Sequence, residues 1–349
     1  MSVENNMECN ANVLLIAPDF FGYAKEIQAC LIRRGVPSVW FDDRPATDTL
    51  TKALIRISPR LQRGKAERYF DDVIRQARQH PITEVVVIKG QALSCEAIQR
   101  MKAAFPQARF TLYFWDSYKN MSADSQNKVQ LFDRAFTFDP VDAGNDPRLE
   151  YRPLFYLDEY ARLPAVEQDI DLFFFGTVHS DRYKVLSQLE RALPTGVRVK
   201  KILYFNSRLV YWARRVFDPS FWGAKKSEFI FKPVAKAELR ALLARSRAVI
   251  DIERPIQSGL TMRTLETVGA HKKLVTTNPF AQCSDIYRPS NVLIIDRVDM
   301  KVPKEFFDTD FESLGELMEQ KYSLDGWLDE VLPSSCVTMT QRGNAASAA

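Results

Sequence analysis

The apolar positions of this chain fall into two alternating patterns. Residues 13–17, 84–88 and 172–175 are short, mainly apolar runs, the pattern of strands buried on both faces. Between such runs, segments such as 23–34 and 65–79 place apolar residues at helical spacing, with charge on the other side. Strands that alternate with helices predict parallel sheets covered by helices, so we expect an α/β fold.

The same patterns predict the other elements. Further strands are expected at residues 39–41, 109–114, 135–138, 197–204, 248–252, 273–277 and 292–295. Further helices are expected at 94–105, 206–217, 234–246, 260–269, 307–321 and 324–332. A chain of 349 residues that is 46% apolar is long enough for two domains, which we place at 1–160 and 170–310. Helices at 311–333 are expected to pack back on the first domain, and 334–349 are expected to be disordered.

The stretch 248–278 carries the clearest candidate binding site, because it is predicted as strand, loop, helix and strand. Ligands of open α/β sheets bind at the carboxyl ends of the strands, where helix amino ends favour anions. Arg263 near the helix start suits a phosphate, and Glu266 one turn later suits a pair of sugar hydroxyls. The alternative is that Arg263 and Glu266 only pair with each other. The candidate substrate-binding residues here are Ser258, Gly259, Leu260, Thr261, Arg263 and Glu266.

Two carboxylates in the amino half are candidate general bases. Asp116 directly follows the strand 109–114, where apolar neighbours would favour a base near neutral pH; the alternative is that it starts a turn. Asp19 follows the first strand and is either a second base or a helix cap. Gly22, Trp115 and Lys119 are expected at the same sheet edge and are further candidate substrate-binding residues.

The second domain offers main-chain groups for a pyrophosphate. Gly176, Thr177 and His179 follow its first strand, where backbone amides hold phosphates without a metal ion. The three histidines have no ligand spacing, and Asp42-Asp43 is a weak acidic pair, so no metal site is expected. No GxGxxG motif follows the first strand, which disfavours dinucleotide binding.

Three blocks of sequence together resemble a known family. They are LYFWDSYKN from residue 112, DLFFFGTVHSDRY from residue 171 and SGLTMRTLE from residue 258. Their order and content are similar to those of GT-B glycosyltransferases, specifically bacterial members of surface-polysaccharide (capsule and lipopolysaccharide) biosynthesis and of the spore-maturation type. One departure is that Glu253 and Glu266 are further apart than the paired glutamates of many retaining members.

This resemblance implies two Rossmann-like domains facing across a cleft, with the acceptor on the first domain and a nucleotide-sugar donor on the second. The implied activity is metal-independent hexosyl or other glycosyl transfer to a surface glycan or a lipid-linked acceptor, without a cofactor. Two alternatives stay open, because fold does not fix function. They are a non-catalytic protein that binds a sugar nucleotide or glycan, and a GT-B-fold sugar-nucleotide epimerase.

Charge and composition bear on location. Residues 194–247 hold thirteen Lys or Arg against three acidic residues, in a chain whose net charge is +4. Within this band the basic, aromatic helix 206–217 would either lie on a membrane near a lipid-linked acceptor or pack in the core. The five scattered cysteines and the absence of a signal-peptide pattern predict the cytoplasm, including the inner face of its membrane. No nucleic-acid partner is expected.

Overall fold

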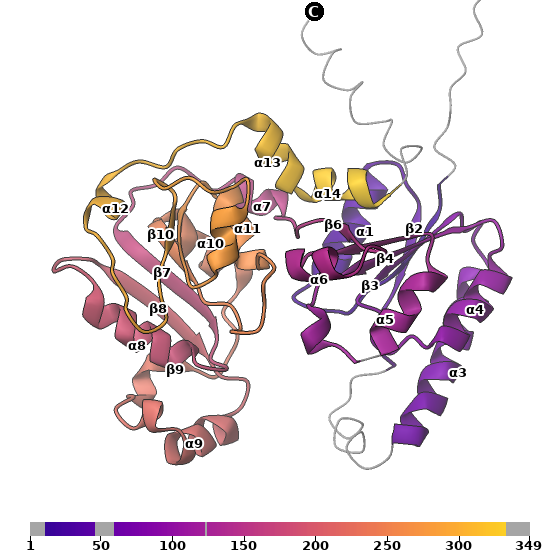
Figure 1. Ribbon diagram of the computed structural model, residues 1–349, viewed down its shortest axis with the longest axis horizontal. Helices are drawn as coiled ribbons and strands as arrows, with labels where there is room; N and C mark the ends of the chain where they lie inside the picture. The colour runs from indigo at the N-terminus through magenta and orange to yellow at the C-terminus, as the bar shows by residue number, and fades with distance from the viewer. Residues whose placement is uncertain (1–10, 46–58, 123, 333–349) are drawn as a thin grey trace, which may run out of the picture. The chain divides into compact units, whose positions relative to one another are not determined.

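The computed structural model describes residues 11–45, 59–122 and 124–332, and its chain forms two compact units (Figure 1). Unit 1 comprises Met1–Pro153 and Leu324–Ala349, and unit 2 comprises Leu154–Ser323. The sequence placed the boundary later, between residues 160 and 170. Its predicted disordered tail, 334–349, lies outside the described residues.

Unit 1 is built on a parallel sheet with the strand order β2-β1-β3-β4-β5-β6. The strands are β1 Val13–Ile16, β2 Ser38–Phe41, β3 Glu84–Ile88, β4 Arg109–Phe114, β5 Arg134–Thr137 and β6 Glu150–Tyr151. The helices are α1 Tyr23–Arg33, α3 Pro59–Ala77, α4 Cys95–Ala104, α5 Asp124–Lys128, α6 Pro140–Asn145 and α14 Leu324–Val331. The predicted alternation of strands and helices is confirmed here, and β3 and β4 have the predicted bounds.

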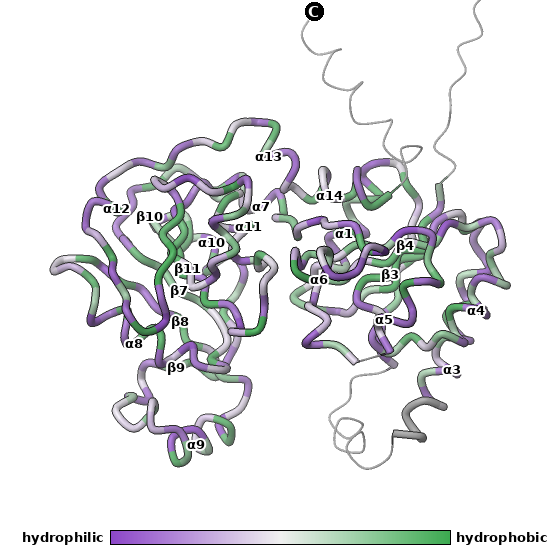
Figure 2. The backbone as a smooth tube through the Cα atoms, viewed as in Figure 1, coloured by the Kyte–Doolittle hydropathy of each residue, from purple (hydrophilic) through white to green (hydrophobic). Residues whose placement is uncertain are grey.

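The core of unit 1 explains why these segments form strands. All four residues of β1 are buried, as are all five of β3, which is the pattern of central strands of a parallel sheet. Figure 2 shows the hydrophobic stretches gathered in the strands. The C-terminal helix α14 completes this core, because its buried Trp327 packs edge-on against Tyr113, with ring centroids 4.8 Å apart. The buried Arg34, directly after α1, pairs with Asp329 of α14.

Unit 2 repeats the plan with the strand order β12-β11-β10-β7-β8-β9, again all parallel. The strands are β7 Ile170–Thr177, β8 Val199–Tyr204, β9 Phe229–Ile230, β10 Ser246–Asp251, β11 Lys273–Thr276 and β12 Val292–Ile294. The helices are α7 Asp158–Ala161, α8 Arg182–Ala192, α9 Arg208–Phe217, α10 Lys236–Ala244, α11 Met262–Gly269, α12 Glu305–Asp308 and α13 Glu316–Tyr322.

A close contact explains why the segment after Pro153 belongs to unit 2. The Tyr156 ring lies on Gly269 of α11, where a Cβ atom would be 2.5 Å from the ring, and the Tyr156 hydroxyl donates to the Glu319 carbonyl at 2.7 Å. Only glycine leaves room for this ring, because real Cβ contacts are longer. Gly269, which the sequence predicted as the end of the helix, therefore also makes room for the Tyr156 ring.

The predicted helix over 307–321 is wrong. The structure has α12 and α13 instead, separated by an irregular segment. The Asn291 side chain fixes that segment by donating to the Glu312 carbonyl at 2.6 Å and accepting from the Glu312 N–H at 2.8 Å. A helix would need these main-chain groups for its own hydrogen bonds. The predicted C-terminal region 311–333 is thus divided, with α13 in unit 2 and α14 in unit 1.

Candidate functional site

The loop between β10 and α11 forms the centre of the candidate site in unit 2. Asp251, the buried last residue of β10, accepts hydrogen bonds from the hydroxyls of Thr261 at 2.6 Å and Thr264 at 2.8 Å. The Thr261 hydroxyl in turn caps α11 by accepting from the Thr264 N–H at 3.1 Å. One buried carboxylate therefore sets where this helix begins.

Two further groups hold the loop itself. The Asn278 side chain donates to the carbonyls of Ser258 and Gly259 at 3.3 and 3.2 Å. The buried Glu253 accepts from Thr277 and from Arg297, each at 2.6 Å. The loop thus reaches the helix start in one fixed conformation, which is the preorganisation that a binding site needs.

Arg182 of α8 joins the ends of two strands in unit 2. It donates to the Thr177 carbonyl after β7 at 3.1 Å and to the Ile252 carbonyl after β10 at 2.8 Å. Gly176 lies beside it, since a Cβ atom there would be 3.4 Å from Arg182 Nη1, an ordinary van der Waals distance. Burial and the nearby cations Arg263 and Arg254 lower the pKa of Arg182 to about 10.

Arg263 and Arg254 extend this positive charge. The Arg263 guanidinium stacks 3.3 Å from the centroid of the Phe175 ring and donates to the Phe175 carbonyl at 2.5 Å. Arg254 is exposed on the loop after β10. The buried carboxylates Asp251 and Glu253 lie near Arg182 and favour its charged form, whereas Arg254 and Arg263 oppose it. We call Arg182, Arg254 and Arg263 the guanidinium cluster.

His179 borders the guanidinium cluster. Burial, together with repulsion of the charged form by Arg182, Arg254 and Arg214, lowers its pKa to about 4. The imidazole is therefore neutral at pH 7. Its Nδ1 atom lies 3.2 Å from the Ser180 hydroxyl.

Glu266 lies one turn after Arg263 and is buried. It shares a hydrogen bond with the Tyr160 hydroxyl, and burial and this carboxylate raise the pKa of Tyr160. The sequence left open that Arg263 and Glu266 only pair with each other. The structure gives each of them another partner, because Arg263 donates to the Phe175 carbonyl and Glu266 bonds to Tyr160.

The structure brings most of the predicted unit 2 residues to one sheet edge. Gly176 and Thr177 end β7, and Arg263 lies in the first turn of α11. Other predicted residues are less available to a ligand. Leu260 is a buried core residue, Ser258 and Glu266 are also buried, and the Thr261 hydroxyl is used by Asp251 and the helix cap. Arg182 and Arg254 were missed by sequence reasoning, although both lie within a few residues of a predicted strand end.

In unit 1 the strand ends carry carboxylates. Asp116 follows β4, and its two oxygens accept from Lys89 Nζ at 3.1 Å and from Asn120 Nδ2 at 3.2 Å. The expected apolar flank is therefore replaced by polar partners on both oxygens. Lys89 follows β3 and is held in the left-handed region with φ 67°. The role of Asp116 as a base stays a prediction.

Asp19 is exposed in the loop after β1, and its N–H donates to the Asp42 carboxylate at 3.2 Å. The alternative of Asp19 as a helix cap is wrong, because Gly22 occupies the cap position of α1 with φ 80°. That left-handed conformation favours glycine and explains Gly22 without a ligand.

Aromatic side chains accompany these carboxylates. Trp115 lies 6.3 Å from Phe20, which lies 4.4 Å from Phe21, both between ring centroids. Phe20 and Phe21 are exposed, at 52% and 67%. Such exposed rings offer apolar faces against which a ligand can stack. Sequence reasoning named only Trp115, and the predicted Lys119 is exposed on the following turn.

Asp43 is a buried acid that the sequence ranked only as part of a weak metal pair. It accepts from the Gln91 N–H at 3.3 Å and pairs with Arg44 at 3.2 Å. Burial raises its pKa to about 6, although Arg44 opposes the shift. The buried Lys128 lies nearby, donating to the Gly90 carbonyl at 3.0 Å.

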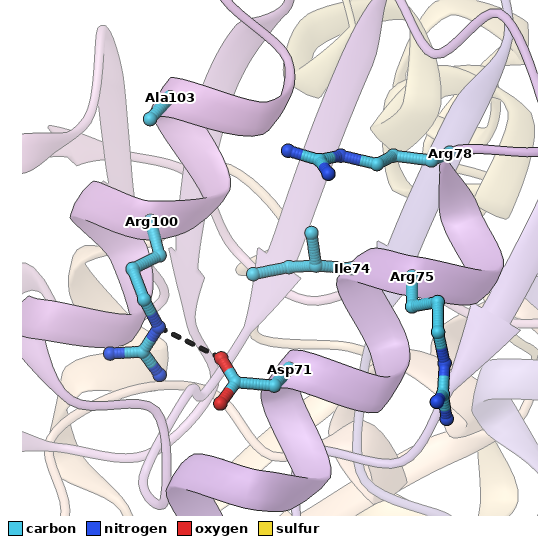
Figure 3. Close-up of a pocket in the computed structure, with 6 residues that line it drawn as sticks. All are labelled: Asp71, Ile74, Arg75, Arg78, Arg100 and Ala103. Atoms are coloured by element: carbon cyan, nitrogen blue, oxygen red, sulfur yellow. Dashed lines mark hydrogen bonds and ion pairs between the residues drawn. The ribbon is translucent and has the colours of Figure 1, made fainter.

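Two other features of the described residues add no further chemistry. Within the described ranges, no three His, Cys, Asp or Glu side chains could hold a metal ion. A shallow hollow of about 410 Å³ between α3 and α4 is lined by arginines and apolar groups (Figure 3). There Arg100 is neutralised by Asp71 at 2.8 Å and Glu67 at 2.6 Å, and no strand end contributes a residue.

Comparison with protein-family models finds no match, and neither does comparison with curated protein sequences. Solved structures, in contrast, match over nearly the whole chain. A glycosyltransferase from Rickettsia africae shares 12% identity, with a TM-score of 0.56 over 97% of each chain. Anabaena HepE in complex with UDP and glucose shares 11% identity, with a TM-score of 0.56 over 97% of this chain and 100% of that one.

A third match is an α,α-trehalose-phosphate synthase (UDP-forming) from Burkholderia xenovorans, in complex with glucose-6-phosphate. It shares 13% identity, with a TM-score of 0.64 over 92% of this chain and 98% of that one. At such low identity the likeness bears on architecture alone. Together with two parallel six-stranded sheets, each interleaved with helices, it shows that the chain has the GT-B fold of two Rossmann-like domains.

Proposed function

We propose that the protein is a glycosyltransferase that moves a sugar from a nucleotide-sugar donor to a glycan or lipid-linked acceptor. The donor is assigned to unit 2 and the acceptor to unit 1. The reaction needs no metal ion in this proposal, because guanidinium groups supply the positive charge that the leaving phosphate requires.

The guanidinium cluster carries the proposal. Arg182, Arg254 and Arg263 lie at the carboxyl edge of a parallel sheet, beside the amino end of α11, where Arg254 and Arg263 repel the charged form of Arg182. Like charges are held together at this edge in the free protein, which an anionic ligand would relieve. A nucleoside diphosphate fits, because its two phosphates accept hydrogen bonds from guanidinium and main-chain N–H groups.

In the proposed reaction an acceptor hydroxyl attacks the anomeric carbon of the donor sugar. The new glycosidic bond forms, and the bond from the anomeric carbon to the phosphate oxygen breaks. The electron pair stays on the nucleoside diphosphate, where the guanidinium cluster stabilises it. Asp116, oriented by Lys89 and Asn120, takes the hydroxyl proton. The exposed Phe20 and the half-buried Trp115 provide an apolar surface for an acceptor ring.

UDP is the nucleotide that we propose for the donor. Two of the similar structures support this choice, since HepE was solved with UDP and the trehalose-phosphate synthase is described as UDP-forming. A polysaccharide or lipid-linked acceptor would place the protein in the cytoplasm, at the inner face of the membrane. Within the described residues, none of the helices combines the length and the apolar character needed to cross a bilayer.

A thermal-shift screen with UDP, GDP, dTDP, CMP and their sugars tests the donor. A ligand at a hundred times its dissociation constant stabilises a protein by about 2.7 kcal/mol, which such a screen detects. We expect UDP and a UDP-sugar to raise the melting temperature. No shift with any nucleotide would contradict the proposal, and a shift without turnover of any sugar nucleotide would favour a binding protein.

Arg263→Ala tests the site. Losing a charged hydrogen bond should weaken nucleotide binding by roughly 1.5–3 kcal/mol, measured by calorimetry. Arg191→Ala is the matched control, because Arg191 is exposed in the last turn of α8, away from the strand ends. Equal affinity of the two variants would remove Arg263 from the site.

A further inference from the structure

The helix α9 of unit 2 exposes its apolar face. Leu209 is 81% and Phe217 82% exposed, and Trp212 and Val216 are more than half exposed. These four residues recur at helical spacing, so they form one stripe along the helix. In Figure 1, α9 and the segment after it project beyond the ends of β8 and β9, and Figure 2 shows hydrophobic stretches along them.

The opposite face of α9 attaches the helix to unit 2. Tyr211 is buried and packs against Phe205, with ring centroids 5.6 Å apart. Arg214 donates to the Ser180 carbonyl at 2.9 Å, and Arg215 donates to the Ala224 carbonyl at 2.6 Å. The predicted core packing is therefore limited to one aromatic residue. Arginines face the protein and apolar side chains face outward, the reverse of an ordinary surface helix.

Exposed cations surround this stripe. Arg208 at the start of α9 lies over the Phe231 ring, 5.7 Å from its centroid. Lys232, the next residue after Phe231, is exposed. Lys225 and Lys226 follow Ala224, whose carbonyl Arg215 holds against the helix. Among the described residues these three lysines form no ion pair. The acids nearest to them in the chain have other partners. Glu228 accepts from the Lys225 N–H at 2.6 Å and from the Tyr183 hydroxyl at 3.1 Å, and Asp218 pairs with Arg214 at 3.7 Å.

We propose that this surface, formed by α9 with Trp222, Lys225, Lys226 and Lys232, docks on an anionic lipid bilayer. Leucine, phenylalanine and two tryptophans suit the boundary between headgroups and acyl chains, and the flanking cations suit lipid phosphates. An apolar protein partner would leave the unpaired lysines without counter-charge, whereas an anionic membrane satisfies both features. This proposal rests on the proposed function, which places the protein at a membrane, and it names the surface that would contact the lipid.

Vesicle co-sedimentation of the full chain tests the proposal without any sugar transfer, so either proposal can fail alone. We expect binding to phosphatidylcholine vesicles that contain phosphatidylglycerol, and weaker binding to phosphatidylcholine alone. Binding should fall between low and high salt, because the screening length shortens from roughly 30 Å at 0.01 M to roughly 3 Å at 1 M. No binding to the anionic vesicles at low salt overturns the proposal.

Two double variants separate the apolar and charged parts. Leu209→Ser with Phe217→Ser should lower vesicle binding by about tenfold or more, because both side chains lose their burial in lipid. Lys225→Gln with Lys226→Gln should lower it roughly 30-fold at low salt. The four residues are exposed, so melting temperatures should stay at the wild-type value.

Matched controls use exposed residues elsewhere in unit 2. Leu317→Ser changes a leucine that is 82% exposed on α13, and Lys301→Gln with Lys304→Gln removes two exposed lysines. Both should bind vesicles like wild type. Equal loss in test and control variants overturns the proposal. A dimer seen by sedimentation velocity would also overturn the proposal if Leu209→Ser with Phe217→Ser dissociates it and leaves vesicle binding unchanged. In that case the apolar face of α9 contacts a second copy of the chain.

Discussion

The two units place opposite charge at the same position of the same kind of sheet. In unit 2 the carboxyl edge carries Arg182, Arg254 and Arg263, while its acids, Asp251 and Glu253, are buried and used for structure. The corresponding edge of unit 1 carries the acids Asp19, Asp42, Asp43 and Asp116. Two lysines and an arginine only partly balance them.

This difference indicates a division of labour. Parallel sheets place helix amino ends and loop residues at the carboxyl edge in both units, so the backbone offers similar geometry twice. The side chains then decide which ligand each edge takes. A cationic edge suits a nucleoside diphosphate, and an edge with carboxylates and exposed rings suits an uncharged hydroxylated molecule that must lose a proton.

Asp116→Asn gives the largest expected effect. If Asp116 takes the acceptor proton, turnover should fall by about 10²–10⁴. Nucleotide affinity should stay nearly unchanged, because the donor belongs to unit 2. Sugar transfer, calorimetry and melting temperature are measured on the one variant. If turnover survives and only stability falls by about 1 kcal/mol, Asp116 is a turn residue, and Asp19 becomes the next base to test.

Arg254→Glu should weaken nucleotide binding roughly tenfold or more, since it replaces a charged donor with a repelling carboxylate. Arg254 is exposed, so the melting temperature without ligand should hardly change. Arg162→Glu, at the residue directly after α7, serves as a control, because Arg162 is also exposed. Calorimetry with UDP compares them, and equal affinities would break the assignment of the anion to unit 2.

Asp43→Asn tests how the acidic edge of unit 1 affects stability. The folded protein raises the pKa of Asp43 to about 6 from 3.8, so it binds this proton more tightly than the unfolded chain does. The ionised form is therefore penalised above pH 6, and the penalty fades as the pH falls toward 4. The variant should gain about 1–3 kcal/mol of unfolding free energy at pH 8 and less at pH 5, by urea denaturation. An equal gain at both pH values would contradict the titration.

His179 gives the smallest effect, read by NMR of its imidazole. Its pKa of about 4 should rise by about one unit or more when UDP binds, because the added negative charge favours the protonated ring. The chain has only three histidines, so His80 and His271 serve as internal references that should not respond to UDP. A His179 signal that is indifferent to UDP would place the nucleotide elsewhere.

The sequence alone determined the order and type of most elements and the division into two α/β domains. Apolar runs such as β1 and β3 leave few alternatives, because only central strands of a parallel sheet bury every residue. The same order placed Asp116, Gly176 and Arg263 at strand ends and a helix start. This follows from local pattern, since a residue after a parallel strand lies at the carboxyl edge whatever its neighbours are.

Tertiary structure decided what those residues contact. Arg182 meets Ile252, seventy positions along the chain, and Lys89 meets Asp116 only because β3 and β4 are neighbours in the sheet. Asn291 replaces a predicted helix with an irregular segment, and Tyr211, Arg214 and Arg215 fix which face of α9 turns inward. Such contacts join distant residues, and helical periodicity reports which side chains share a face but not whether protein, water or another surface covers it.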